Sequence, residues 1–184
     1  MIVKSADDLK LLDDQVQEIE LVEFPLLAIE VDLLKRFGEL LSLTCTKMYL
    51  NDLEFIPKTI QNLAFYNCFI EKIDDLKQFT NLYTLSITNC SISMGKIVLP
   101  LLEKLDISYS RVEGEEFLLF LDNLEELNIC SCVIKNYDFL RSLVNLKRFI
   151  IDEVSYNNNL ELMRELEQKN ILIYDEMGGC YNEV

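Results

Sequence analysis

The sequence predicts an α/β solenoid of about eight short repeats, a curved right-handed superhelix with a parallel sheet of about eight short strands on its concave face. Three observations predict it: a period of 22 residues, a pair of apolar residues at a fixed place in each repeat, and further apolar residues between these pairs. The chain of 184 residues contains only 5 Gly and 3 Pro, and no flexible linker divides it. We therefore expect one domain over residues 1–184.

The period becomes visible when one apolar anchor residue is aligned in every repeat. Successive anchors are separated by 22, 22, 22, 20, 22, 22 and 22 residues. A second apolar residue stands two positions after each anchor, as in a strand that buries one face. The anchors are Ile19, Leu41, Leu63, Leu85, Leu105, Leu127, Phe149 and Ile171. The second residues are Leu21, Leu43, Phe65, Ile87, Ile107, Ile129, Ile151 and Ile173.

The remainder of each repeat carries apolar residues of its own at nearly helical spacing, for example Ile73, Leu76 and Phe79. This spacing predicts 3₁₀ or short helical turns on the outer side of the solenoid. One such repeat cannot bury its apolar face alone, whereas stacked neighbours can.

The two ends of a solenoid need caps, because a terminal repeat would otherwise expose its core. We expect an N-terminal cap over residues 1–15, in which Ser5 caps a helix and Asp8 lies in its first turn. The repeats occupy residues 16–174, with a helix over 160–166 before the last strand at 171–174. Residues 175–184, which include Gly178 and Gly179, are expected to form a short, mobile C-terminal tail.

The repeat motif is L-x-x-L-x-L-x-x-C-x-I, clearest over residues 82–92 and present again over 124–134. It resembles the leucine-rich-repeat family in its short intracellular 22-residue form, that of the Sds22-like proteins. The repeats of the spliceosomal A-prime protein and of the acidic leucine-rich nuclear phosphoproteins are similar too. Such repeats usually have Asn, bonded to backbone groups of the neighbouring turn, where this chain has Cys68, Cys90 and Cys132. Thr46 and Ser110 are predicted to fill the same column.

The cysteines in this column allow two interpretations. Thiols of adjacent repeats would lie about 5 Å apart at strand spacing, which leaves a thiol metal site as one alternative. The sequence has no His and no C-x-x-C pair, and this favours buried structural thiols. We expect no metal and no cofactor.

The net charge of −15 excludes some classes of partner. Direct nucleic-acid binding is disfavoured, since phosphates attract a basic surface, and so is an anionic membrane. An acidic surface suits a basic protein partner or serves solubility. The first residues are charged too early for a signal peptide, and no apolar run reaches the ~20 residues of a membrane span. With six cysteines, this predicts a reducing location, cytoplasmic or nuclear.

The absence of His also excludes several kinds of enzyme. No Ser-His-Asp triad, Cys-His pair or His-ligated metal centre can form. The sequence contains neither G-x-G-x-x-G nor a P-loop. We therefore predict that the chain is not an enzyme.

The candidate site is the concave face, formed by side chains that alternate with the buried pairs. Lys104, Glu126 and Arg148 form a row of alternating charge, which either pairs internally or contacts a ligand. The predicted partner-binding residues are Tyr66, Thr84, Ser86, Thr88, Lys104, Asp106, Ser108, Glu126, Asn128, Arg148, Ile150, Asp152 and Tyr174. An edge or the convex side remains an alternative.

The predicted function is protein–protein interaction, as an adaptor or regulatory subunit that binds a protein partner, basic or helical, on its concave sheet. The alternative is a structural component of a nucleoprotein particle, spliceosomal or ribosome-associated, that binds a basic protein and touches RNA at its rim. Sensitivity of the complex to salt and nuclease separates the two.

Overall fold

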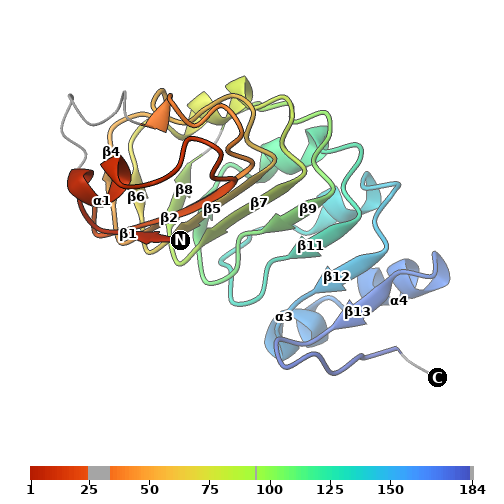
Figure 1. Cartoon of the computed structure of the whole chain (residues 1–184). Helices are drawn as coiled ribbons and strands as arrows, with labels where there is room; N and C mark the ends of the chain where they lie inside the picture. Colours follow the sequence, from red (N-terminus) through yellow and green to blue (C-terminus); the bar gives the residue numbers. More distant parts are fainter. Residues whose placement is uncertain (25–33, 94, 183–184) are drawn as a thin grey trace.

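The computed structural model describes residues 1–24, 34–93 and 95–182, and these residues wind into a solenoid with one long parallel sheet (Figure 1). In this part of the chain the sheet has nine strands, each hydrogen-bonded in parallel to the next. The predicted α/β solenoid is confirmed. In spatial order the strands are β1 (Ile2–Val3), β2 (Glu18–Val22), β3 (Ser42–Thr46), β5 (Asn62–Tyr66), β7 (Thr84–Thr88), β9 (Lys104–Asp106), β11 (Glu126–Asn128), β12 (Arg148–Ile150) and β13 (Leu172–Tyr174).

The segments that return from one strand to the next contain short elements. The predicted 3₁₀ turns are present as η1 (Ile73–Gln78), η2 (Glu115–Phe120) and η3 (Asp138–Arg141). Two small parallel pairs, which the sequence did not predict, join β4 (Tyr49–Leu50) to β6 (Phe69–Ile70) and β8 (Ser91–Ser93) to β10 (Arg111–Glu113). The last turns contain α3 (Glu153–Asn158) and α4 (Leu160–Gln168), and α4 covers the predicted helix.

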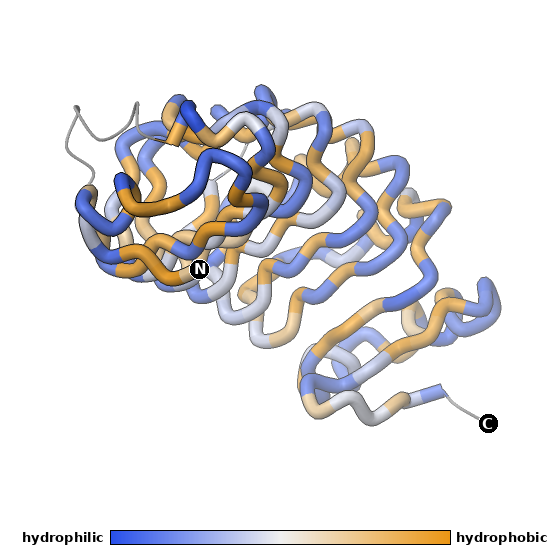
Figure 2. The backbone as a smooth tube through the Cα atoms, in the orientation of Figure 1, coloured by the Kyte–Doolittle hydropathy of each residue, from blue (hydrophilic) through white to orange (hydrophobic). Residues whose placement is uncertain are grey.

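One hydrophobic core runs along the solenoid from Val3 to Ile173. In β3, β5 and β11 the core residues alternate with exposed or half-buried ones, as a one-sided sheet requires, while in β7 the intervening Ser86 is itself buried. Hydrophobic segments recur at corresponding places in successive turns of the chain (Figure 2). Each repeat therefore buries its apolar side chains against its neighbours. Among the described residues, none of the helices has the length and apolar character to cross a membrane.

The strand register corrects two of the predicted anchors. Leu43, and not Leu41, pairs with Ile19 on one side and with Leu63 on the other. At the other end, Ile173 and not Ile171 pairs with Phe149. A shift of two residues keeps every side chain on the same face of a strand, so the apolar alternation could not detect it. The same shift places Met48, and not Thr46, next to Cys68.

A column of left-handed residues supports this register. Four positions after the anchors from Ile19 to Leu127, the backbone has a positive φ of 50–58°. The residues are Glu23, Lys47, Asn67, Asn89, Tyr109 and Ser131. Each ends its strand with the same sharp turn, and this turn sends the chain away from the sheet.

The N-terminal cap forms as predicted and also contributes a strand. The Ser5 hydroxyl accepts the Asp8 N–H at 3.2 Å, and the Asp8 carboxylate accepts the Ser5 N–H at 3.0 Å. This reciprocal pair begins α1 (Ala6–Lys10). The two residues of β1, which precede it, form the outermost strand of the sheet.

The C-terminal segment corrects the expectation of a mobile tail. Tyr181 donates its N–H to the Ile173 carbonyl at 2.8 Å, and the Asn182 side chain bonds the Ile173 N–H at 2.9 Å and the Ile171 carbonyl at 2.8 Å. The Tyr181 ring stacks on Tyr156, with centroids 4.1 Å apart. Residues 175–182 therefore turn back along β13 and satisfy backbone groups that an uncovered edge strand would expose.

Candidate interaction surface

The sheet has an open face, made of the side chains that alternate with the core residues of β5 to β13 and of the residues just after these strands. The strand pairing arranges the predicted site residues in rows across the sheet. One row is Thr84, Lys104, Glu126, Arg148 and Leu172, and the next is Ser86, Asp106, Asn128, Ile150 and Tyr174. Tyr66 pairs with Thr88 in a third row. The two-residue shift of β13 moves Tyr174 beside Ile150, while its side chain stays on the open face.

The row of alternating charge pairs internally. Glu126 Oε2 lies 3.6 Å from Lys104 Nζ and 3.9 Å from Arg148 Nη1. The Arg148 guanidinium also lies 4.5 Å from the centre of the Tyr174 ring. Exposed pairs of this kind contribute about 0–1 kcal/mol each. They orient these side chains, and the two basic residues of the predicted site share the single carboxylate of Glu126.

Two neighbouring polar residues join adjacent strands. Asn128 Nδ2 donates to Asp106 Oδ2 at 3.2 Å, while Asp106 Oδ1 accepts the Ser108 N–H at 2.9 Å. Asn128 Oδ1 accepts the Cys130 N–H at 3.0 Å. These side chains therefore hold the ends of β9 and β11 in addition to facing outward.

Three other predicted site residues serve the fold as well. Ser86 and Ser108 are only 8% and 4% exposed, so they offer a partner little surface. Asp152 caps α3 by accepting the Ser155 N–H at 2.9 Å, and it also accepts the Ser131 N–H at 3.2 Å. Burial alone would raise the pKa of Asp152, but the hydrogen bonds from Ser155 and Ser131 hold this pKa below its ordinary value.

Sequence reasoning missed a contact that crosses the open face. Glu176 Oε2 accepts the Tyr109 hydroxyl at 2.9 Å and lies 3.7 Å from Cys130 Sγ. Burial, and then the charges of Glu176 and Asp152, raise the pKa of the Cys130 thiol to about 11. The correct anchor, Ile173, would have placed Glu176 in the same column as Cys130 but two strands away, so the register alone would not have revealed this contact.

The side chains of Cys68, Cys90, Ser110 and Cys132 form hydrogen bonds between repeats. Cys68 donates to the Cys45 carbonyl at 3.3 Å, Cys132 to the Ile107 carbonyl at 2.8 Å, and Ser110 to the Ile87 carbonyl at 2.8 Å. Burial is the main cause that raises the pKa of the three thiols. In the described ranges, no group of three or more His, Cys, Asp or Glu side chains is placed to hold a metal ion.

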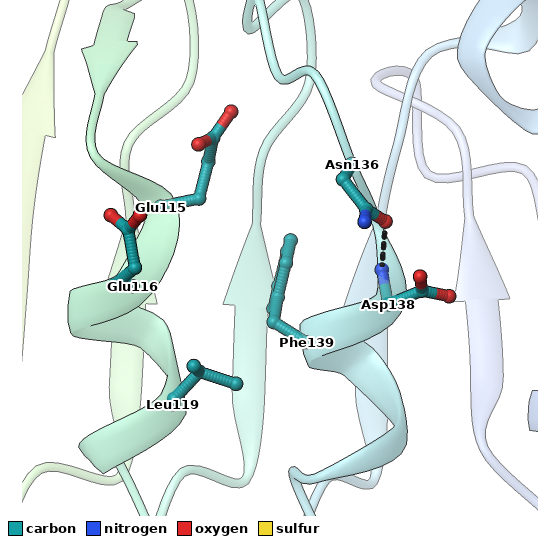
Figure 3. Close-up of a pocket in the computed structure, with 6 residues that line it drawn as sticks. All are labelled: Glu115, Glu116, Leu119, Asn136, Asp138 and Phe139. Carbon is teal, nitrogen blue, oxygen red and sulfur yellow. Dashed lines mark hydrogen bonds between the residues drawn. The ribbon is translucent and has the colours of Figure 1, made fainter.

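The outer side of the solenoid has a hollow between η2 and η3 (Figure 3). Leu119 and Phe139 supply its apolar wall, and Glu115, Glu116, Asn136 and Asp138 surround them. Asn136 Oδ1 accepts the Asp138 N–H at 2.8 Å, and Glu115 accepts the Lys135 N–H at 2.8 Å. Three of the six lining residues, Glu115, Glu116 and Asp138, carry carboxylates.

No protein-family model and no curated protein matches this sequence. Among solved structures, the chain is similar to an internalin from Listeria monocytogenes, with a TM-score of 0.63 and 19% identity over 87% of this chain and 47% of that one. It is also similar to an internalin C2 from the same organism, with a TM-score of 0.60 and 20% identity over 94% and 76% of the two chains. The chain is similar as well to a leucine-rich-repeat protein from Leptospira interrogans, with a TM-score of 0.50 and 17% identity over 88% of this chain and 49% of that one.

These similarities and the repeating parallel sheet define the class: the chain has the leucine-rich-repeat fold. At identities of 17–20% they show the fold alone. The chain spans about half the length of the first and third of these proteins.

Proposed function

We propose that the chain is a non-enzymatic interaction module, an adaptor or regulatory subunit of one domain, that binds a protein partner on its open face. The observation that carries this proposal is the continuous arrangement of side chains, most of them exposed or half-buried, in rows across β5 to β13. In the finer assignment that we propose, the chain is of the Sds22-like type, with Cys in the Asn column, and works in the cytoplasm or nucleus.

The dimensions of the sheet suit a macromolecular ligand. The six strands from β5 to β13, about 4.8 Å apart, span roughly 24 Å, which is the length of a helix of about 16 residues. An interface of standard size, about 800 Å² per partner, fits on such a surface.

The side chains of the open face suit a protein ligand in particular. Tyr66 is 38% exposed, and Tyr174 is half-buried under Arg148. Tyrosine and arginine are enriched among the residues that dominate binding energy in protein interfaces. Between the two tyrosines, the half-buried Thr84 and Thr88 make a low surface on which a partner's backbone can approach.

The test compares two folded variants of the full chain in affinity capture from a native lysate, with quantitative mass spectrometry. Tyr66→Ala with Thr84→Arg changes the open face. Tyr49→Ala with Ser91→Arg makes the same pair of changes at exposed positions on β4 and β8, away from that face. We expect the first variant to lose its specific partner about ten-fold or more, and the second to retain it.

If both variants retained the partner equally, the partner would not bind on the open face. Release of the partner by nuclease, with a steep loss of binding as salt rises, would instead favour a nucleoprotein component.

A further inference from the structure

We propose that the turn after β13, residues 175–179, is a strap that Tyr109 fastens over part of the open face, and that the strap has to be released before the partner occupies that part. The consequence for binding rests on the proposed function. The strap itself can be tested without any partner.

The strap is fastened by a hydrogen bond between distant parts of the chain. Tyr109 lies in the turn after β9 and Glu176 in the turn after β13, and the strands between them in the sheet are β11 and β12 (Figure 1). Three strand spacings amount to roughly 14 Å, so both side chains have to extend toward each other. The Tyr109 hydroxyl then donates to Glu176 Oε2 at 2.9 Å. The pair therefore bridges the ends of β11 and β12.

The burial of Cys130 shows what the strap covers. Leu127 and Ile129 point into the core, so Cys130, one residue further on, alternates to the open face. Cys130 is nevertheless only 1% exposed, and it does not belong to the hydrophobic core. Its Sγ lies 3.7 Å from Glu176 Oε2, the same oxygen that accepts the hydrogen bond from Tyr109. Glu176 therefore lies over a side chain that would otherwise belong to the open face.

Tyr109 stands at a backbone position that does not favour tyrosine. Its φ is 58°, in the left-handed region, where two other repeats have Asn67 and Asn89. Asparagine is enriched in this region, whereas a bulky residue there is an outlier. Backbone strain of this kind is found where a side chain has a task beyond the turn. At Tyr109 the task that the structure shows is the hydrogen bond to Glu176.

The turn that carries Glu176 is closed by its own hydrogen bonds. The Asp175 N–H donates to the Gly179 carbonyl at 2.8 Å, and Asp175 Oδ1 accepts the Gly179 N–H at 2.7 Å. Among the hydrogen bonds and ion pairs of the described residues, only those of Glu176 with Tyr109 and Cys130 join the strap to the earlier strands. The strap can therefore leave the open face without unfolding.

The exposure of both groups allows the strap to open at equilibrium. Tyr109 is 53% exposed and Glu176 is exposed, so water competes for the hydroxyl and for the carboxylate. Minor conformations of this kind are populated at about 0.1–10%. A partner that needs the open form binds with its intrinsic affinity reduced by the open fraction. Loss of the Tyr109 hydroxyl should therefore strengthen binding of the partner.

The first measurement is the rate at which N-ethylmaleimide alkylates each cysteine of the full, folded chain, read by mass spectrometry of its peptides. Tyr109→Phe removes the hydroxyl and keeps the ring, and it should speed the alkylation of Cys130 about five-fold or more. Cys132, which donates to the Ile107 carbonyl in the core, should react as slowly as before.

The matched control is Tyr83→Phe. Tyr83 is also partly exposed, and its hydroxyl makes no hydrogen bond among the described residues, so this variant should leave the Cys130 rate unchanged. A Cys130 rate no faster in Tyr109→Phe than in Tyr83→Phe would overturn the strap. An equal acceleration of Cys132 would overturn it too, because the thiols would then report opening of the whole core.

The second measurement is affinity capture of the natural partner from native lysate. Tyr109→Phe should hold the partner about three-fold more strongly than the wild-type chain, and Tyr83→Phe should hold it equally. If Tyr109→Phe speeds Cys130 alkylation but does not hold the partner more strongly, the strap does not restrict binding, and this inference fails while the proposed function stands. If Tyr66→Ala/Thr84→Arg retains the partner, the proposed function fails, whereas the alkylation of Cys130 still decides whether the strap exists.

Discussion

Ser110 stands in a column of cysteines, and its hydrogen bonds explain which residue types this position accepts. Its hydroxyl accepts the Cys90 N–H at 3.0 Å and donates to the Ile87 carbonyl at 2.8 Å. Cys90 does the same one repeat earlier, with the Cys68 N–H at 3.3 Å and the Phe65 carbonyl at 3.8 Å. In these repeats the position holds a small side chain that both accepts and donates, and either a hydroxyl or a thiol can do so.

The first prediction concerns this residue. Ser110→Ala should lower the free energy of unfolding by about 1–3 kcal/mol, because it leaves the buried Cys90 N–H and Ile87 carbonyl without a partner. Ser110→Cys should cost less, because a thiol keeps both bonds in weaker form. Urea unfolding measures the change, and the exposed Ser91→Ala, expected to stay within about 0.5 kcal/mol, is the control. A Ser110→Ala cost no larger than that of the control would mean that these bonds do not hold the repeats together.

The contacts of a site residue could be predicted from the sequence only where that residue and its neighbours lie in the strands, which repeat regularly. Lys104, Glu126 and Arg148 stand directly before correctly assigned anchors, and the charged row they were predicted to form is present. Tyr109 and Glu176 are 67 residues apart, and their contact depends on a turn after β13 that no periodicity describes. The structural roles of Asp152 and Ser108 could not be predicted. In the sequence, a polar residue that caps a helix or closes a turn stands at the same alternating positions as a polar residue that faces a ligand.

At the scale of elements, the apolar period predicted the strands but could not always place them. Leu41 and Leu43 are both apolar and are two residues apart, so they lie on the same face of a strand. Either residue could therefore serve as the buried anchor. The left-handed residue after the strand would have decided the register. Asn67 and Asn89 belong to a residue type that is enriched in the left-handed conformation, whereas Glu23 and Lys47 do not, so their sequence does not predict it. The unequal lengths of the first repeats therefore became visible only in the strand pairing.

The second prediction tests this left-handed column. Ser131 has a φ of 57° and is exposed, so substitution there changes mainly the backbone energy. Ser131→Val should reduce the free energy of unfolding by about 1–2 kcal/mol relative to Ser131→Gly, because a β-branched residue is disfavoured in the left-handed region and glycine is not.

The matched control is Ser93→Val compared with Ser93→Gly, at an exposed position in β8 with extended backbone. There valine should be favoured over glycine, because β-branched residues suit strands. Chemical unfolding of the four variants measures both differences. If the difference in unfolding free energy between the valine and glycine variants had the same sign at both positions, the turn after β11 would not require a left-handed residue.

The whole molecule is a row of repeats in which each turn is stabilised mainly by its immediate neighbours. The core is continuous from Val3 to Ile173, but each strand of the sheet hydrogen-bonds only to the strands next to it. The two ends are closed differently: β1 and α1 cover the first repeat, and residues 175–182 run back along β13. Stability in such a row is close to a sum of local terms, so damage at one end should remain near that end.

The last prediction follows from this arrangement. Deletion of residues 175–184 removes the Tyr181 bond to Ile173, both Asn182 bonds and the Tyr156–Tyr181 stack. We expect amide hydrogens of β13 and α4 to exchange faster, while those of β3, β5 and β7 keep their protection. Hydrogen exchange read by mass spectrometry, peptide by peptide, measures this gradient. An equal loss of protection in every strand would show that the solenoid unfolds as one unit, and no loss in β13 would show that its edge needs no cover.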